Sequence, residues 1–162
     1  MADILSAAIK TSVSWTRAED TALGLRKDKK LLSTAIAIDD GSASGQANKV
    51  FHDLRTIAAN SVDAINLSSM TQQMFTTAVP SSMTVVRALR VLNKSTTVGA
   101  AINLGASATS PFSSYAVRIG SGSEAVISNW QEGWPVVSSD SILRVSNPNS
   151  TAATYEIVII GS

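Results

Sequence analysis

Apolar and polar residues alternate along much of this chain, and this period-two pattern constrains the possible folds more than any other feature of the sequence. It is clearest in residues 33–38, 62–67 and 84–92, and it is typical of strands that bury one face. Clusters of Asp, Asn, Gly, Ser and Pro separate such segments at regular intervals, as in residues 39–42 and 147–150. The sequence therefore predicts an all-β fold.

Ten strands follow from this pattern. They are predicted at residues 4–15, 30–38, 49–57, 61–67, 83–93, 98–104, 115–119, 124–129, 141–147 and 153–161. One helical turn is predicted over residues 68–75, because a serine can cap it and Pro80 prevents its extension. Residues 88–97 also align without gaps on residues 142–151 through a shared Leu-Arg-Val-x-Asn pattern. Each copy is interpreted as a β-hairpin in which an Asn-led turn joins two strands.

The length of 162 residues is typical of one compact domain. Strands in this number predict a two-sheet antiparallel β-sandwich, jelly-roll-like in topology. Charge is uneven, since residues 1–60 hold fifteen charged side chains and residues 103–162 hold six. We interpret residues 1–30 as an extended N-terminal arm or first strand region and residues 31–162 as the sandwich domain. The charged run at residues 26–30 is interpreted as a solvated turn between two strands.

The composition argues against several classes of function. The chain has no cysteine and one histidine, so thiol catalysis and Cys- or His-ligated zinc are not expected. A net charge of +1 gives no long-range attraction to a polyanion. No apolar run approaches the roughly 20 residues of a membrane span. We expect no metal, no cofactor, no nucleic acid and no membrane among the ligands and partners.

The sequence contains no recognisable catalytic set. His52 stands beside Asp53, but adjacent strand residues point to opposite faces and cannot easily form a base–orienter pair. No G-x-S-x-G elbow, P-loop or G-x-G-x-x-G fingerprint occurs. His52 is therefore expected to be structural, and the chain is not expected to be an enzyme. A hydrolase is kept as a third hypothesis, which a screen of glycosidase and esterase substrates would test.

Three segments carry a resemblance to a known family. Residues 45–56 contain G-Q-A-x-K-x-F-H-D-x-R-T, residues 91–97 read V-L-N-K-S-T-T, and residues 155–161 read Y-E-I-V-I-I-G. Together they resemble a family of small tailed-bacteriophage virion proteins. The resemblance implies a capsid decoration or cement protein with a jelly-roll-like β-sandwich, located in the virion and assembled in the bacterial host cytoplasm.

The same resemblance implies the partners. A decoration protein would bind the major capsid protein as a homo-oligomer, a dimer or trimer, and would stabilise the shell by binding its assembled form at many sites. The N-terminal arm would lie across a neighbouring subunit. The candidate contact residues are Trp15, Arg17, Lys27, Arg87 and Arg90. Arg87 and Arg90 could equally occupy solvated or edge positions.

An alternative function keeps the virion but changes the role. A head-fibre, tail or adaptor component of this size could carry a receptor- or glycan-binding β-sandwich. Tyr115, Trp130 and Trp134 would then form the stacking platform for a sugar. Tryptophans at such positions also serve as core residues or as anchors of protein contacts.

Overall fold

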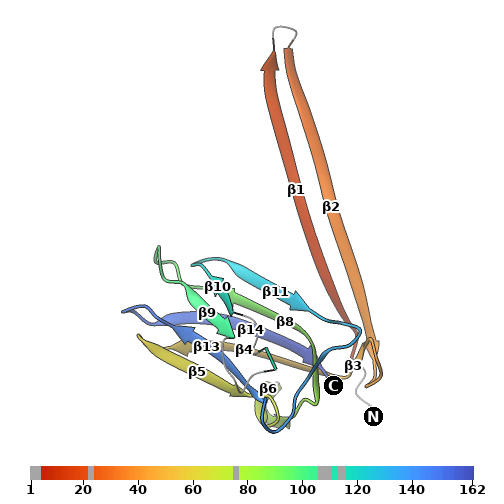
Figure 1. The fold of residues 1–162 in the computed structure, drawn as a ribbon, viewed down its shortest axis with the longest axis vertical. Helices are drawn as coiled ribbons and strands as arrows, with labels where there is room; N and C mark the ends of the chain where they lie inside the picture. The colour runs from red at the N-terminus through yellow and green to blue at the C-terminus, as the bar shows by residue number, and fades with distance from the viewer. Residues whose placement is uncertain (1–4, 22–23, 75–76, 106–110, 113–115) are drawn as a thin grey trace.

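The computed structural model describes residues 5–21, 24–74, 77–105, 111–112 and 116–162. These residues form fourteen strands and no helix, so the all-β prediction is confirmed (Figure 1). Most of the strands build a two-sheet sandwich, and the first two form a long arm that stands away from it.

Two antiparallel sheets form the sandwich. The larger sheet has the spatial order β11 (Glu124–Ser128), β8 (Val85–Asn93), β14 (Ala153–Gly161) and β4 (Lys49–Ile57), with the short β12 (Trp134–Pro135) also paired to β8. The smaller sheet has the order β10 (Ala116–Ile119), β9 (Ile102–Gly105), β13 (Ile142–Asn147) and β5 (Ser61–Asn66). The predicted two-sheet antiparallel β-sandwich is therefore present.

The chain passes from one sheet to the other at four of the connections between neighbouring strands in the sequence. The connections β4–β5, β8–β9, β10–β11 and β13–β14 each join a strand of one sheet to a strand of the other. The consecutive strands therefore occupy matching places in the two sheets. This order is compatible with the jelly-roll-like topology expected from the sequence.

The core lies between the two sheets, and the alternation along each strand fills it. On β14, Tyr155, Ile157 and Ile159 are fully buried, whereas Val158 and Ile160 lie half-buried on the outer face of the larger sheet. A β-branched strand of this kind is typical of a sheet that is apolar on both faces.

The two copies of the Leu-Arg-Val-x-Asn pattern are not hairpins, which corrects the prediction. Each copy ends a strand and leads the chain across to the other sheet, because β8 and β9 lie in different sheets, as do β13 and β14. Asn93 and Asn147 are buried at these crossings, at 0% and 1% exposure. The Nδ2 of Asn93 donates to the carbonyls of Ala100 and Ile119 at 2.8 and 3.1 Å. The repeat therefore marks two equivalent crossings of the sandwich.

The predicted helical turn at residues 68–75 is also wrong over its described part. Met70–Met74 form strand β6, which pairs antiparallel with β7 (Thr77–Ser81). Backbone pairing with β7 satisfies the amides that a helix would otherwise have bonded internally. The two strands form a separate two-stranded sheet beside the sandwich.

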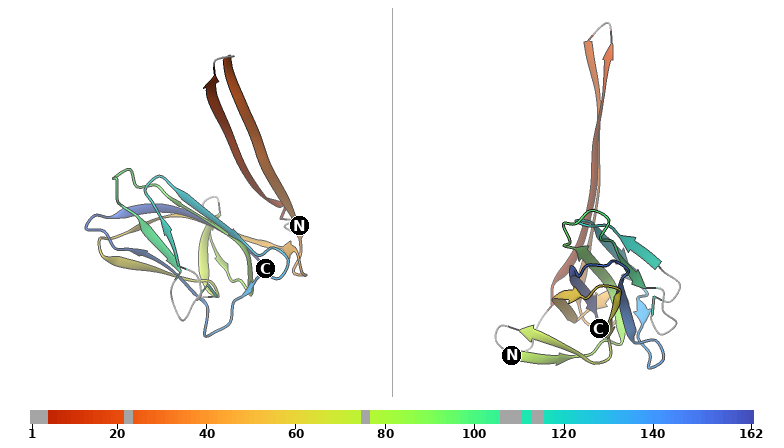
Figure 2. Two further views of the ribbon diagram at one scale, coloured as in Figure 1. Left: turned by 45° about the horizontal axis from the view of Figure 1, so that its top comes forward. Right: turned by 90° about the vertical axis from the view of Figure 1, so that its left-hand side faces the viewer.

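The N-terminal arm is a long β-hairpin. Strands β1 (Ala7–Thr21) and β2 (Gly24–Asp40) pair antiparallel along the whole of β1, and β3 (Gln46–Ala47) pairs in parallel with the last two residues of β2. Fifteen residues in a strand span roughly 50 Å. Figure 2 shows the hairpin standing away from the sandwich in two further views. The arm thus reaches Asp40 instead of ending at residue 30, and the charged run at residues 26–30 is part of β2 and not a turn.

Candidate interaction surface

One face of the arm is apolar in the half that lies nearer the sandwich. It carries the odd-numbered residues of β1 and their partners on β2, because residues opposite each other in the ladder share a face. Val13 pairs with Leu32 and Trp15 with Lys30, and these apolar side chains are exposed: Val13 at 62%, Leu32 at 54% and Trp15 at 41%. We call this side the apolar face of the arm. Apolar side chains gathered in this way are typical of a surface that contacts another molecule.

Charges of opposite sign follow on the same face toward the tip. Arg17 is paired with Asp28, and Glu19 with Arg26. Opposite charges directly across a ladder stabilise the pairing by a few tenths of a kcal/mol to about 1 kcal/mol. The apolar face therefore ends in a region whose charges are matched within the arm itself.

The other side, which we call the hydroxyl face of the arm, is different in character. It carries the even-numbered residues of β1, among them Ser12 opposite Ser33 and Ser14 opposite Leu31. Lys27 lies on this face opposite Ala18, with no acidic residue directly across the ladder. The arm is thus amphipathic, with an apolar face and a face of hydroxyl and lysine side chains.

Arg87 binds the segment of residues 41–47 where the arm joins the sandwich, which we call the root of the arm. The chain leaves β2 through residues 41–45, and the Arg87 guanidinium donates to the carbonyl of Ala43 at 3.0 Å and to that of Gln46 at 3.2 Å. A third bond of 2.8 Å reaches the carbonyl of Gln131 in the loop after β11. Arg87 is 4% exposed. It holds two loops of its own chain and offers no surface to another molecule, so we take it out of the predicted contact residues.

A bulge in β8 places Arg87 at this position. Along the β8–β14 ladder, Ile160 lies opposite Ala88 and Gly161 lies opposite Val86, so Arg87 has no partner on β14. An unpaired residue in one strand of a ladder redirects the side chain next to it. Gly133 allows the neighbouring loop to approach, because a Cβ there would lie 2.2 Å from Val85 Cγ1 and its φ is +72°.

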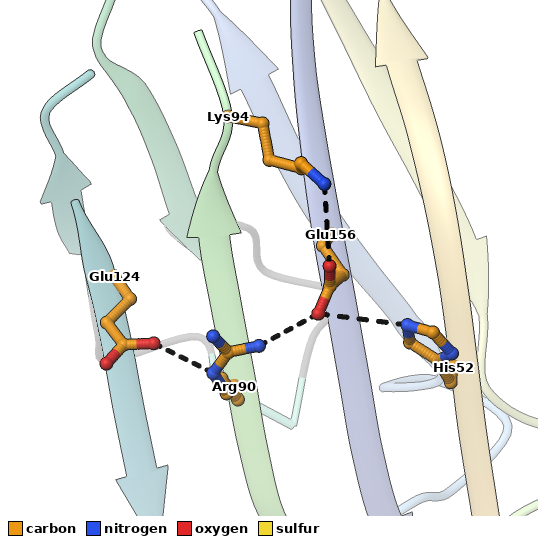
Figure 3. Close-up of polar contacts among 5 residues, drawn as sticks. All are labelled: His52, Arg90, Lys94, Glu124 and Glu156. Carbon is orange, nitrogen blue, oxygen red and sulfur yellow. Dashed lines mark hydrogen bonds and ion pairs between the residues drawn. The ribbon is translucent and has the colours of Figure 1, made fainter. Parts of the chain in front are cut away.

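The outer face of the larger sheet carries a row of charges across all four main strands (Figure 3). Arg90 on β8 lies between Glu124 on β11 and Glu156 on β14, with N···O distances of 2.8 and 2.9 Å. Glu156 is also 3.8 Å from Nε2 of His52 on β4 and 3.9 Å from Lys94 Nζ. Burial would lower the pKa of Arg90, but the hydrogen bonds that it donates to the two glutamates outweigh burial and raise the pKa above its ordinary value. The predicted contact residue Arg90 therefore lies on the surface with its charge already paired.

A groove lies where the base of the arm meets this sheet. Its volume is about 340 Å³, and it is lined by Ala8, Ile9 and Lys10 of β1 together with sheet residues that include Val126 and Ile160. The lining of the groove is apolar except for the charged residues Lys10, Arg90 and Glu124. It makes the outer face of the sheet continuous with the base of the arm.

A second polar cluster lies inside the sandwich at the edge where β4 meets β5. Arg55 binds both oxygens of Asp63, through Nε at 2.6 Å and Nη2 at 2.9 Å, and it binds Asp53 through Nη1 at 2.8 Å. The Tyr155 hydroxyl donates to Asp63 Oδ2 at 2.9 Å. These four side chains come from three strands, β4, β5 and β14, and tie the two sheets together.

The electrostatics of this cluster follow from its geometry. Burial alone would raise the pKa of Asp63, but the hydrogen bonds from Arg55 and Tyr155 outweigh it and the pKa lies below its ordinary value. The hydrogen bond with Asp63 raises the pKa of Arg55. Burial, followed by the charge of Asp63, raises the pKa of Tyr155 well above its ordinary value. The cluster thus holds its acid ionised and its tyrosine protonated, which suits a structural bond more than proton transfer.

The structure separates His52 from Asp53 as the alternation predicts. His52 points to the outer face toward Glu156, and Asp53 bonds Arg55 at the inner edge of the sandwich. Among the described residues, no group of three or more His, Cys, Asp or Glu side chains could hold a metal ion. None of these residues forms a helix that could cross a membrane.

The predicted sugar platform is divided by the fold. Trp134 is half-buried on β12, and its ring lies 4.8 Å from that of Phe112 at an interplanar angle of 56°. Trp130 is half-buried beside Gly45 at the arm root. Tyr115 lies outside the described residues. The stacking role stays a prediction that no geometric observation favours.

The other predicted contact residues all lie on the arm. Trp15 and Arg17 are on its apolar face, and Lys27 is on its hydroxyl face. The side chains that sequence reasoning missed are Val13, Leu31 and Leu32. For Val13 the signal was its alternation with Ser and Thr in residues 11–16, whereas Leu31 and Leu32 are adjacent and show no alternation.

Comparisons with protein-family models, with characterised proteins and with solved structures find no match to this chain.

Proposed function

We propose that this chain is a non-enzymatic structural protein of a tailed-bacteriophage virion, a capsid decoration protein that binds the major capsid protein through its arm. The observation that carries the docking role is the exposed apolar face of the arm, with Val13, Leu32 and Trp15 at its centre. The virion assignment is supported by the resemblance of residues 45–56, 91–97 and 155–161 to small virion proteins.

The physical argument for docking concerns the stability of the arm. A two-stranded ribbon is marginal in water by itself and needs further strands or a packed face to be stable. The residues of β1 from Lys10 to Glu19 are all exposed, so the sandwich does not supply that packing. Contact with a neighbouring subunit would bury the apolar face and order the arm. Each copy bound in this way favours the assembled shell over its separate subunits.

The receptor- or glycan-binding alternative makes a different use of the molecule. It needs exposed aromatic rings near one another, and Trp134 packs against Phe112 instead. The arm has no role in that alternative. A shell-binding protein accounts for the arm and for the sandwich together.

The test compares two leucines that are adjacent in sequence but lie on opposite faces of the arm. Leu32 is on the apolar face at 54% exposure and Leu31 is on the hydroxyl face at 65% exposure. Leu32→Lys should abolish cosedimentation with phage shells that lack this protein, because a charge would be buried in the contact. Leu31→Lys is the matched control and should still bind.

Cryo-electron microscopy of intact particles gives the position directly. Density for the sandwich on the outer capsid, with the arm lying on a neighbouring subunit, is the expected result. Density in a tail or fibre would replace the decoration role by the receptor-binding alternative. Equal cosedimentation of both lysine variants would show that the apolar face is not the docking surface.

A further inference from the structure

The outer edge of β1 has no described strand paired to it, and it is open beyond the groove at residues 8–10. Strand β1 pairs with β2 on one side, and none of the described strands pairs with its other side. Its outward-pointing N–H and C=O groups over residues 10–19 are therefore available to another strand. Such an edge is a ready template for strand addition.

The middle of the β1 edge lacks the residues that usually protect a free edge. Residues 11–16 read Thr-Ser-Val-Ser-Trp-Thr, with no charge, no proline and no glycine. Edges that must stay unpaired usually carry lysines, prolines or bulges. The outer edge of β2 is less available at both of its ends, because residues 26–30 are five charged side chains in succession and residues 39–40 already pair with β3. The outer edge of β1 has no described strand paired to it at either end.

We propose that two copies of this chain pair antiparallel along β1 and form one four-stranded sheet in the order β2–β1–β1–β2. The inference does not rest on the capsid role, since it needs only the chain itself. A two-fold axis relates the copies, so the contact closes on itself and does not propagate.

Backbone geometry restricts the register of this pairing. Outward-pointing groups belong to alternate residues of β1, and an antiparallel ladder joins outward residues to outward residues. Residue numbers opposite each other must therefore sum to an even number. The sum of 28 puts Ser14 on the two-fold axis and pairs residues 10–18 with the same residues of the copy.

The side chains agree with this register. Val13 lies opposite Trp15 of the second copy, and the same pair occurs again across the axis. An aromatic residue against a β-branched one is a favourable cross-strand pair. Lys10 lies opposite Ala18 and Arg17 opposite Thr11, so no like charges meet. The even sum also puts the apolar faces of both arms on the same side of the new sheet.

Energetics favour the four-stranded form. Sheets of three or more strands with an apolar face are stable where a single hairpin is marginal. Pairing also doubles the width of the apolar face formed by Val13, Trp15 and Leu32. The dimer would therefore offer one continuous docking surface in place of two narrow ones.

The first test uses engineered cysteines, since the natural chain has none. In Ser14→Cys the two thiols would face each other across the axis, with Cα atoms about 4.5–5.5 Å apart, which a disulfide can bridge. Ser33→Cys is the matched control on β2, because the two β2 strands would be three strand spacings or about 14 Å apart and the two Ser33 positions farther still. Mild oxidation should convert Ser14→Cys to a covalent dimer and leave Ser33→Cys uncrosslinked.

The second test is the solution mass. The natural chain should sediment at twice its mass of 16.9 kDa. Ser14→Lys places two lysines opposite each other and should raise the dissociation constant of the dimer about tenfold, whereas Ser33→Lys should leave it unchanged. Circular dichroism confirms that each variant keeps its strands.

A natural chain with the mass of one or three copies would overturn the proposal. Equal crosslinking of the two cysteine variants, or equal dissociation of the two lysine variants, would also overturn it. The capsid role would stand in each case if shells still bind the monomer, because cosedimentation is measured separately.

Discussion

The Tyr155 hydroxyl donates a 2.9 Å hydrogen bond to Asp63 Oδ2, and this bond joins β14 of the larger sheet to β5 of the smaller one. Tyr155 is completely buried in the core. Arg55 binds the same carboxylate from β4. A single acceptor thus receives bonds from two strands of the opposite sheet, close to the edge of the sandwich.

Tyr155→Phe should lower the free energy of unfolding by about 2 kcal/mol at neutral pH, because a hydrogen bond to a charged acceptor is lost. The variant should also change the response to alkali. Since the pKa of Tyr155 is raised in the folded state above its ordinary value of 10.0, its stabilisation is present below pH 10 and is lost as the pH rises further. Urea unfolding of both proteins from pH 7 to 11 measures this.

The difference between the natural chain and Tyr155→Phe isolates the tyrosine from the lysines, which titrate in the same range in both proteins. The natural chain should lose stability more steeply above pH 10 than the variant. A constant difference across the whole pH range would show that Tyr155 ionises as freely in the folded state as in the unfolded one.

The sequence pattern predicted most of the sandwich strands, although the short β12 was missed. Residues 49–57 and 153–161 were predicted with the boundaries that β4 and β14 have, and the β-branched residues of 153–161 are typical of a strand. The two strands of the arm were harder to predict from the sequence. Hydroxyl residues in β1 alternate with few strongly apolar ones, and the charged run of residues 26–30 resembles a turn although it lies within β2.

The polar clusters could be predicted only in part. Asp53 and Arg55 are two residues apart in one strand, so a shared face was visible from the sequence. Tyr155 joins them through the pairing of β14 with β4, and Asp63 joins them across the sandwich from β5, and no local pattern contains either contact. Arg87 reaches the arm root because of a bulge in β8, and bulges depend on the partner strand as much as on the local sequence.

Arg87→Ala should loosen the root of the arm. Three carbonyls, those of Ala43, Gln46 and Gln131, would lose their donor, and the cost should be about 3 kcal/mol. Arg87→Lys should recover part of this loss, because an ammonium group can donate to some of the same carbonyls but lacks the planar fork of the guanidinium.

Hydrogen exchange shows where the effect falls. Amides of residues 41–47 and of the loop 129–133 should exchange faster in Arg87→Ala, while those of β13 should change little. Uniformly faster exchange throughout the sandwich would contradict a local role for Arg87 at the arm root.

The last prediction concerns Asn93 and Asn147, which are buried at equivalent positions in the two crossings of the sandwich. The Nδ2 of Asn147 donates to the carbonyls of Ala58 and Thr151 at 3.0 and 2.8 Å. The Oδ1 of each asparagine accepts the amide two residues further on, at 3.1 Å in both cases. Replacing either by alanine leaves buried backbone groups without partners and should cost about 2–3 kcal/mol.

Asn149 joins the two crossings, because its Nδ2 donates to Asn147 Oδ1 at 2.6 Å and to the carbonyl of Ala101 at 2.7 Å. Asn93 and Asn147 themselves have no hydrogen-bond partner in common, so their effects should add. The double variant Asn93→Ala with Asn147→Ala should therefore lose the sum of the single losses in urea unfolding. Asn48→Ala, at an exposed position before β4, is the control and should change stability by less than about 0.5 kcal/mol. A double variant that loses much less stability than the sum of the two single losses would mean that the first substitution already opens both crossings. The two copies of the repeat would then form one cooperative unit instead of two independent ones.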